Sequence, residues 1–280
     1  MPSEASVFPK IGLALSGGAA RGMAHVGVLR ALIESDISID CVAGTSAGSI
    51  VGGAYAAGMS IEEIRGFGRT LRWRDIGRVT MSRLGIQSNE RLEQYLRARM
   101  PVTKFEELQI PFAAVATDLQ TGMAVVMRDE GDVPFAIRAS CAIPGWYVPV
   151  PDDQGRQLVD GGLVAVVPTT MARSLGADIV IAVDVNSEGA TFIGPTSSVI
   201  GVLLQSLLVV QKTASHNQRE MADLVINPKV GHIRWDEMGR ADELMAAGYE
   251  AALQRIPEIR ALIEVSATKR HTTHQMEIPA

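Results

Sequence analysis

Short apolar runs alternate with stretches of helical periodicity over most of this chain. An apolar run at Ile11–Leu15 predicts a buried strand, and apolar positions three or four apart over residues 24–33 predict a helix behind it. The same pair recurs as an apolar run at 40–43 and a run of small and apolar residues at 49–57. Further strands are predicted at 111–117, 123–128, 157–159, 179–185 and 224–227, and further helices at 61–71, 89–100, 133–141, 168–175, 197–218 and 241–263. This alternation indicates an α/β fold of three layers, in which a mainly parallel central sheet carries helices on both faces.

Two longer stretches interrupt the alternation. Residues 72–87 are basic and lack periodicity, so we expect an irregular excursion that flanks a binding cleft. Residues 143–153 are rich in proline and carry Trp146 and Tyr147, which predicts a loop with two large aromatic side chains.

The ends of the chain are polar. Residues 1–9 are expected to form a short tail and residues 266–280 a disordered one, which leaves residues 10–265 as a single domain. The N-terminus lacks the apolar core of a secretory signal. The longest apolar run, 199–210, is shorter than the about 20 residues that a bilayer span requires. We therefore expect a cytoplasmic protein, with peripheral contact at the inner membrane face left open.

Composition and charge limit the classes of partner and cofactor that we expect. A net charge of −5 and a pI near 5.6 provide no basic field, so nucleic acid is not an expected partner. Cys41 and Cys141 lie in apolar surroundings and predict buried thiols in a reducing compartment. The five histidines are scattered and form no zinc-spaced pair with a cysteine, so neither a metal nor another cofactor is expected.

Residues 44–48 carry the clearest chemical signal, the sequence Gly-Thr-Ser-Ala-Gly. Gly-x-Ser-x-Gly is the nucleophile-elbow pattern, which presents a serine hydroxyl at a sharp strand-to-helix turn. Gly44 and Gly48 leave room for that reversal, because side chains there would collide with neighbouring backbone. Ser46 is therefore a candidate nucleophile, and the alternative is a plain glycine-rich turn.

A serine nucleophile needs a base and donors for the oxyanion that develops. The loop at 16–22 follows the first strand and contains small residues whose N–H groups a substrate can approach. Asp160 stands at the end of another apolar strand, before two glycines. In a parallel sheet these stretches and Ser46 would gather at the carboxyl ends of the strands, where α/β folds place their sites.

Three motifs in this order resemble the patatin-like phospholipase family, in the bacterial branch related to the catalytic domain of neuropathy target esterase. The family's oxyanion pattern Gly-Gly-Gly-x-Arg/Lys-Gly, nucleophile elbow and Asp-Gly-Gly/Ala motif are matched by Gly17-Gly18-Ala19-Ala20-Arg21-Gly22, Gly44-Thr45-Ser46-Ala47-Gly48 and Asp160-Gly161-Gly162. Residues 116–122 and 138–145 also resemble family stretches, so the matches run from about residue 11 to 185. Ala19 stands where plant patatins have a third glycine, and a positive φ there would be strained. We expect the oxyanion hole to be retained.

The resemblance implies a hydrolase of lipid acyl esters, on phospholipid or lysophospholipid, with a Ser–Asp dyad and an acyl-enzyme intermediate. Ser46 would be the nucleophile and Asp160 the base that takes its proton. The oxyanion hole would fall on Gly17, Gly18 and Ala19. A site-structuring role is implied for the other matched residues, which are Arg21, Gly22, Gly44, Gly48, Gly161 and Gly162.

The residues alone leave other readings open. His216 and His232 follow Asp160 in the Ser-Asp-His order of α/β-hydrolases. His216 lies in a polar part of a predicted helix and is expected at the surface, so His232 is the alternative base. His25, one turn past the glycine loop, is expected to be a packed or capping histidine. A nucleotide-binding protein, with Asp40 as the ribose-binding acid, and a non-catalytic regulatory protein are the rival functions.

Apolar segments point to a lipid or acyl-ester substrate. Trp146 and Tyr147, beside three prolines, are the candidate lipid contacts, in an acyl-chain pocket or on a membrane-touching surface. The apolar half of the helix at 197–218 fits core packing or a homodimer face better than lipid contact.

Overall fold

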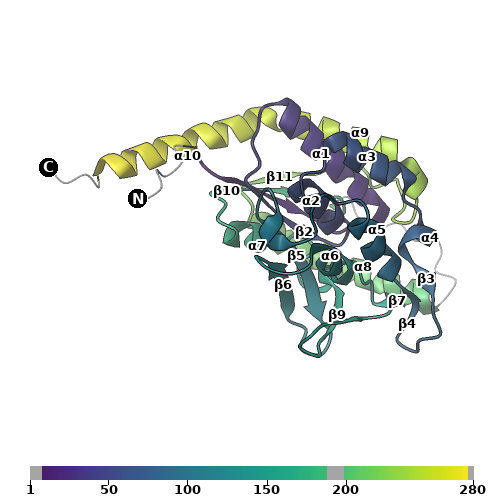
Figure 1. The fold of residues 1–280 in the computed structure, drawn as a ribbon. Coiled ribbons are helices and arrows are strands. Elements are labelled where there is room, and N and C mark those ends of the chain that lie inside the picture. The colour runs from purple at the N-terminus through teal and green to yellow at the C-terminus, as the bar shows by residue number, and fades with distance from the viewer. Residues whose placement is uncertain (1–7, 188–198, 277–280) are drawn as a thin grey trace.

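The computed structural model of this chain describes residues 8–187 and 199–276 (Figure 1). Its main sheet has the strand order β11-β10-β1-β2-β5-β9-β8, and β6 also pairs with β5. These strands are β1 (Ile11–Leu15), β2 (Cys41–Thr45), β5 (Phe112–Asp118), β6 (Ala124–Arg128), β8 (Val150–Pro151), β9 (Gln157–Asp160), β10 (Ile179–Val183) and β11 (Leu224–Ile226). The strands from β11 to β5 are parallel, while β6 and β9 run antiparallel to β5. The predicted mainly parallel sheet is confirmed.

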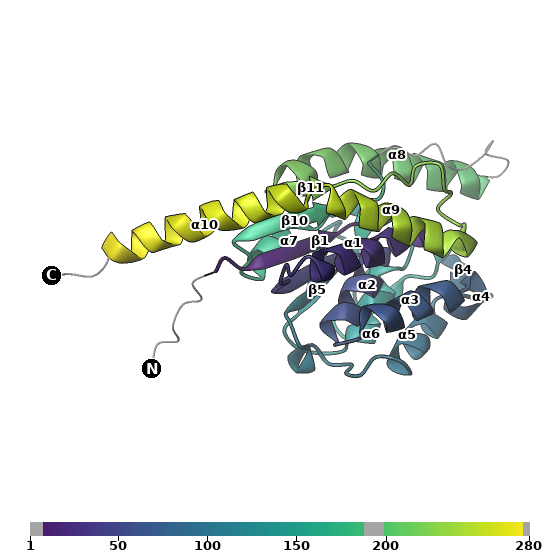
Figure 2. The ribbon, with the colours of Figure 1, turned by 90° about the horizontal axis from the view of Figure 1, so that it is seen from above.

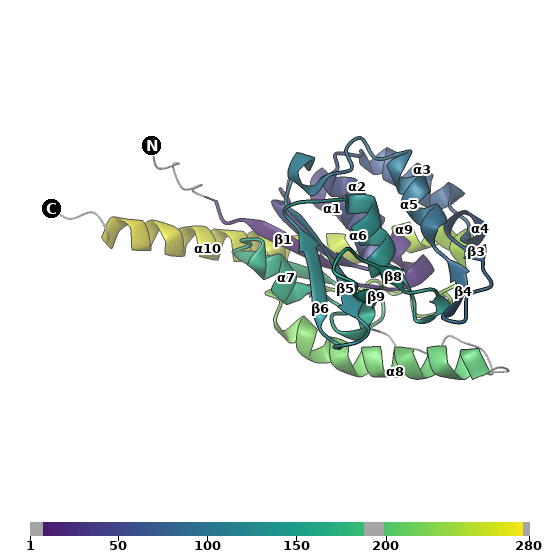
Figure 3. The same cartoon turned by 60° about the horizontal axis from the view of Figure 1, so that its bottom comes forward.

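Helices cover both faces of this sheet (Figure 3). Side chains that alternate along a strand point to opposite faces: Leu13 and Leu15 of β1 pack in one cluster, and Ala14 in another. The first face carries α1 (Met23–Glu34), α2 (Ala47–Ala56), α3 (Ile61–Thr70), α5 (Glu90–Arg97) and α6 (Val133–Ser140); the second carries α7 (Thr169–Ser174) and the long helix α8 (Val199–Glu220). Helix α9 (Ala241–Leu253) packs along α1. The three-layer prediction is thus confirmed.

The register around β5 positions the site. β2 runs beside β5 and ends at Thr45, opposite Val115. β9 approaches the same strand from the opposite direction and ends at Asp160, opposite Ala116. The carboxyl ends of β2 and β9 therefore meet beside two consecutive residues of β5. The sequence predicts that the Ser46 and Asp160 motifs both follow parallel strands. This holds for Ser46 after β2 and is wrong for Asp160, because β9 runs antiparallel to β5.

A small second sheet replaces two predicted irregular stretches. Residues 72–87 contain helix α4 (Trp73–Ile76) and most of a hairpin formed by β3 (Arg78–Val79) and β4 (Gly85–Ser88). The expected loop at 143–153 contains β7 (Gly145–Tyr147), which pairs in parallel with β4, and β8 of the main sheet. Strands this short leave little alternation in the sequence, and their pairing joins residues far apart in the chain.

The predicted closing helix at 241–263 is two helices. α9 ends at Leu253 and α10 (Ile256–Met276) begins one residue before Pro257, whose missing N–H and ring prevent an uninterrupted helix. α10 continues past residue 265, where the sequence prediction placed the end of the domain, and extends from one end of the molecule (Figure 2). The rest of the predicted tails, residues 1–7 and 277–280, lies outside the described residues. Within the described ranges, no helix has the length and apolar content to cross a membrane.

Candidate active site

Ser46 stands at the turn between β2 and α2 in a strained conformation. Its φ is 51° and its ψ is −121°, a combination that costs residues with a side chain of order 1–3 kcal/mol. Hydrogen bonds hold it there: its carbonyl accepts from the Ser49 N–H at 2.9 Å and from the Ser49 hydroxyl at 2.6 Å. The side chain is nearly buried, with 8% exposed. This is the geometry of a nucleophile elbow.

Both glycines of the elbow are needed for close backbone approach. A Cβ on Gly44 would lie 2.5 Å from the Gly48 carbonyl oxygen, and one on Gly48 would collide with the Leu15 carbonyl. Gly22 is equally constrained, because a side chain there would collide with Ala47 at the start of α2. The steric reason predicted for Gly44 and Gly48 is confirmed, and the structure adds the same reason for Gly22.

Ser140, at the end of α6, is a support that the sequence reasoning missed. Its hydroxyl accepts from the Ser46 N–H at 2.8 Å and donates to the Val115 carbonyl at 2.6 Å. It is fully buried. One hydroxyl thus ties the elbow to β5, and the only signal for it was its place in the stretch 138–145.

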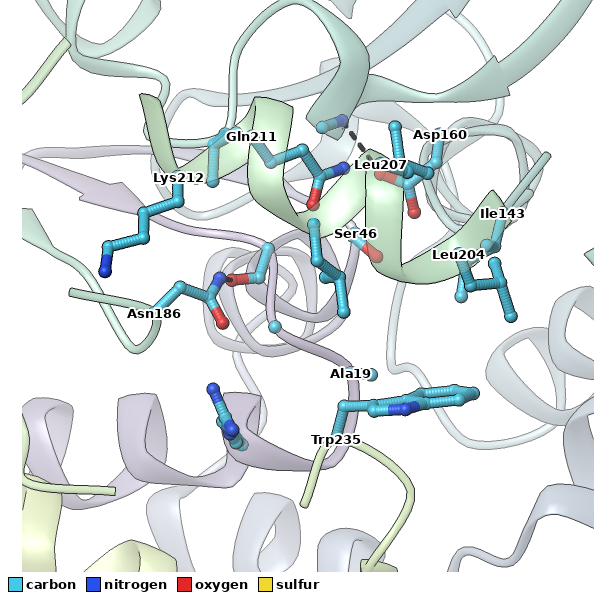
Figure 4. A pocket seen from close by; sticks show the side chains of 16 residues that line it. Ala19, Ser46, Ile143, Asp160, Asn186, Leu204, Leu207, Gln211, Lys212 and Trp235 are labelled. Atoms are coloured by element: carbon cyan, nitrogen blue, oxygen red, sulfur yellow. Dashed lines mark hydrogen bonds between the residues drawn. The ribbon is translucent and has the colours of Figure 1, made fainter. Parts of the chain in front are cut away.

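Asp160 lies beside Ser46, and their side chains point toward each other (Figure 4). Burial raises the pKa of the Asp160 carboxyl from 3.8 to about 6, against the opposing effects of hydrogen bonds from the Gly162 N–H and the Ser46 hydroxyl. The Gly162 N–H donates to Asp160 Oδ1 at 2.8 Å, and a side chain on Gly161 would collide with the Val115 carbonyl. The glycines therefore let the strand end turn tightly and aim the carboxylate.

The glycine loop offers two backbone donors rather than three. The Gly17 N–H already donates to the Val166 carbonyl at 3.0 Å. In the described part of the chain, the N–H groups of Gly18 and Ala19 donate to no other residue, and both residues line the cavity at Ser46. Ala19 begins the 3₁₀ helix η1 (Ala19–Gly22) with a φ of 48°, the positive value expected to be strained for alanine. Gly18 and Ala19 are the candidate oxyanion donors.

Residues at the end of β10 hold this loop in place. The Asn186 side-chain amide donates to the Gly17 carbonyl at 2.7 Å, and the Val185 N–H donates to the Ser16 hydroxyl at 3.1 Å. Sequence reasoning also missed Asn186, since nothing in its local pattern distinguishes it from an ordinary turn residue. The loop is thus positioned by residues about 170 positions away.

None of the histidines considered from the sequence lies at Ser46. His232 is exposed and pairs with Glu243 at 2.8 Å, and His216 is exposed on α8 near Glu220. His25 is fully buried and bonds the Ser16 carbonyl at 2.9 Å, and burial lowers its pKa to about 4. The expected surface position of His216 and packed position of His25 are confirmed. His232, the alternative base, lines neither cavity that opens on Ser46.

Arg21 is buried, with 3% exposed, and its Nε donates to the Ile233 carbonyl at 2.7 Å. It connects η1 to the segment before α9 and lines the cavity at Ser46, a position compatible with the site-structuring role implied by its motif.

Two cavities share Ser46, Ala19 and Ile143 in their walls. The first, which we call the α8 cavity, also contains Asp160, Asn186 and Trp235, and α8 closes it with Leu204, Leu207, Leu208 and Gln211 (Figure 4). The second, the apolar cavity, runs among helices α1 to α5 and is lined by Met23, Ile50, Phe67, Leu71, Trp73 and Leu92, with Cys141 near Ser46. Ser46 is thus reached from two sides.

The predicted lipid contacts take different places. Tyr147 is 1% exposed and lines the apolar cavity, so of its two predicted settings the membrane-touching surface is excluded and the acyl-chain pocket remains. Trp146 packs edge-to-face on Trp235, which packs in the same way on Trp73. The tryptophans therefore form a cluster beside both cavities. Among the described residues, no group of three or more His, Cys, Asp or Glu side chains is arranged to hold a metal ion.

The chain is similar in sequence to known patatin-like and NTE family proteins and similar in fold to a solved structure. The model of the patatin-like phospholipase family matches residues 13–173. An uncharacterized NTE family protein from Mycobacterium tuberculosis is 40% identical over 188 residues, which cover 66% of this chain and 51% of that protein. A lysophospholipase from Mycosarcoma maydis is 38% identical over 185 residues, which cover 63% of this chain and 10% of that protein. The chain therefore spans about half the length of the mycobacterial relative and a tenth of the fungal one. VipD from Legionella pneumophila shares the fold, with a TM-score of 0.53 and 14% identity, over 89% of this chain and 67% of VipD.

Proposed function

Because the chain belongs to the patatin-like phospholipase family, we propose that it hydrolyses lipid acyl esters, with Ser46 as nucleophile and Asp160 as general base. The observation that carries the proposal is the meeting of β2 and β9 beside β5, which sets a strained serine against a buried carboxylate. The N–H groups of Gly18 and Ala19, which have no partner among the described residues, lie at the same cavity and supply the third element, a place for an oxyanion.

The proton balance of the proposed reaction involves Asp160 alone. Above a pH of about 6 its carboxylate accepts the Ser46 proton while Ser46 Oγ attacks the ester carbonyl carbon. The carbonyl oxygen becomes an oxyanion that accepts hydrogen bonds from the loop. Collapse breaks the bond to the alcohol, which takes the proton from Asp160. A water molecule then gives a proton to Asp160, attacks the acyl-enzyme, and leaves a fatty acid and a reprotonated Ser46.

The two cavities suit the two halves of such a substrate. The apolar cavity, whose walls carry no charged side chain, fits the acyl chain. The α8 cavity, which contains Asp160 and the polar side chains of Asn186, Gln211 and Lys212, is the proposed place for the alcohol and for the attacking water. An acyl group seated in the apolar cavity would have its ester carbonyl at Ser46, within the loop that carries the Gly18 and Ala19 amides.

The proposal also covers the substrate class, membrane contact, cellular location and oligomeric state. Phospholipid and lysophospholipid are the proposed substrate classes, and the fungal relative's name as a lysophospholipase supports the second. A substrate of this kind resides in a membrane, so we include peripheral membrane contact in the proposal. The buried free thiols of Cys41 and Cys141 are compatible with a cytoplasmic location, and the exposed apolar side of α8 with a homodimer.

Substitution of Ser46 tests the function directly. Ser46→Ala is expected to lower hydrolysis of a p-nitrophenyl acyl ester by roughly 10⁴- to 10⁶-fold and to leave the melting temperature nearly unchanged. A fluorophosphonate probe should label wild-type protein at Ser46, as located by peptide mass spectrometry, and should not label the variant.

His232→Ala is the matched control for the alternative base. It should retain full activity, because His232 is exposed and paired with Glu243. Loss of activity in His232→Ala, together with retained activity in Asp160→Asn, would replace the dyad with a triad.

A further inference from the structure

The hairpin between β3 and β4 exposes large apolar side chains that neither cavity uses. Met81 is fully exposed, and Val79 and Leu84 are 74% and 55% exposed. Single exposed apolar residues need no explanation, but three within six positions on one projecting tip form a patch that points to a binding partner.

The charge of this hairpin segment is opposite to that of the protein. The chain carries a net charge of −5, whereas residues 72–87 contain four arginines and one aspartate. Arg78 and Arg83 flank the apolar tip, are exposed, and form no ion pair with any of the described residues. The tip therefore combines insertion-sized apolar side chains with cations that are free to meet an anionic surface.

The hairpin is joined to the walls of the site. β4 pairs with β7, and a side chain on Gly85 would meet the backbone of Tyr147 at 2.6 Å. The Tyr147 side chain in turn lines the apolar cavity. The hairpin tip is thus one strand away from the proposed acyl-chain pocket.

The first turns of α8 expose apolar side chains at the same end of the molecule. Val202 and Leu203 are 50% and 64% exposed, while Leu204 and Leu207 on another side of α8 line the α8 cavity. In Figures 1, 2 and 3 the hairpin and the beginning of α8 lie at the end opposite the far end of α10, which is also where the parallel strands end. Exposed apolar surface therefore borders both cavities.

We propose that the hairpin tip and the first turns of α8 form a docking face for an anionic lipid bilayer. This docking face consists of Arg78, Val79, Met81, Arg83, Leu84, Val202 and Leu203. A bilayer fits better than a protein partner because it is fluid: it accepts a projecting tip without a matching pocket, and its phosphates meet both arginines while the apolar side chains enter the acyl boundary. The inference rests on the proposed function only in that the substrate resides in a membrane.

Vesicle binding without turnover tests the docking face. The full chain carrying Ser46→Ala is sedimented with vesicles of phosphatidylcholine alone and of phosphatidylcholine with phosphatidylglycerol. Arg78→Gln/Arg83→Gln is expected to weaken binding to the anionic vesicles by about 30-fold, since each cation near such a surface contributes about 1 kcal/mol. Met81→Ser should weaken binding to both vesicle types by about 10-fold, because it removes apolar burial rather than charge.

Arg260→Gln/Val265→Ser is the matched control, since it removes an exposed arginine and an exposed apolar residue from α10, the helix that extends away from the docking face (Figure 2). It should bind both vesicle types like the parent. Equal binding by the docking-face variants and the parent, or no preference of the parent for anionic vesicles, would overturn the proposal. A hairpin variant that turns a dimer into a monomer without altering vesicle binding would assign the face to a second copy of the chain instead.

Failure of the docking face and failure of the proposed function have different signatures. Made in the wild-type chain, with Ser46 intact, the same hairpin substitutions should leave the rate on a water-soluble short-chain ester at the wild-type value, because none of the substituted side chains lines either cavity at Ser46. They should lose activity only on vesicles. A wild-type protein that hydrolyses no ester, combined with the predicted binding pattern of the Ser46→Ala variants, would refute the hydrolase proposal and support the docking face.

Discussion

The α8 cavity and the apolar cavity meet at Ser46 but are lined by different structural elements. The apolar cavity is enclosed by helices on one face of the sheet, whereas the α8 cavity contains the end of β9, the glycine loop and one helix from the other face. Only the α8 cavity contains Asp160. The difference teaches that the proposed base, Asp160, and the Gly18 amide lie on one side of Ser46, whereas the other side is lined by apolar residues and shares Ala19 with the first.

Asp160 gives this comparison its strongest test. Asp160→Asn keeps the shape of the side chain but removes the proton acceptor, so kcat/KM should fall by roughly 10⁴-fold. In the wild type, activity should rise with pH through about 6 as the carboxyl ionises. A pH profile of kcat/KM with its acidic limb near the unperturbed value of 3.8 would contradict burial as the source of the shift.

The same substitution should stabilise the protein. The folded-state pKa of Asp160 is raised from 3.8 to about 6, so its favourable contribution is present below pH 3.8 and is lost as pH rises through 6. The full loss corresponds to about 3 kcal/mol. Asp160→Asn should therefore raise the free energy of unfolding at pH 8 by up to that amount and have little effect at pH 4. Asp118→Asn, at the buried end of β5, where hydrogen bonds from the Thr121 hydroxyl and the Gln120 N–H lower the carboxyl pKa, should destabilise instead.

Gly18 tests the oxyanion side of the comparison. A Cβ there would collide with the Val185 side chain, which is stiff because it is β-branched, so Gly18→Ala should displace the loop and misdirect the Gly18 and Ala19 amides. The expected cost is about 10²- to 10³-fold in kcat with folding retained, as judged by circular dichroism. Gly66→Ala, with open space around it, is the control. Full activity in Gly18→Ala would remove this loop from the oxyanion hole.

Chain-length dependence separates the two cavities. In the wild type, each added methylene of the acyl chain should raise kcat/KM up to about 4-fold until the apolar cavity is full. Leu71→Trp fills part of that cavity, so the rise should stop at shorter chains, with long-chain esters reduced by about 10- to 100-fold. Leu207→Trp in the α8 cavity should leave the chain-length profile unchanged. The opposite pattern would exchange the roles of the cavities.

Ala19 has the smallest expected effect. Ala19→Gly relieves a positive φ worth about 1–2 kcal/mol, but the unfolded chain gains entropy worth about 0.5–1 kcal/mol. A net stabilisation of about 1 kcal/mol or less, with activity retained, should appear in chemical denaturation. Marked destabilisation would mean that the Ala19 methyl group makes contacts worth more than the strain.

Local motifs explain how much of the site was predictable. Ser46, Asp160 and their glycines were identified because tight turns demand particular residues at fixed spacing, and the strain at Ala19 followed from the same argument. Gly17 was counted as an oxyanion donor because its N–H partner, Val166, is a remote residue. The same distance hid Ser140 and Asn186, whose hydrogen bonds join residues 94 and 169 positions apart.

The sequence by itself determined the parts of this protein that depend on neighbouring residues: the strand and helix alternation, the elbow at residues 44–48 and the turn after Asp160. Only the tertiary structure decided what these parts do together. The antiparallel approach of β9 brings Asp160 to Ser46, burial raises the pKa of its carboxyl to about 6, and the pairing of β4 with β7 places a basic, apolar hairpin beside the site. The physical reason is that hydrogen-bonded register and burial arise between segments distant along the chain, which no local pattern encodes.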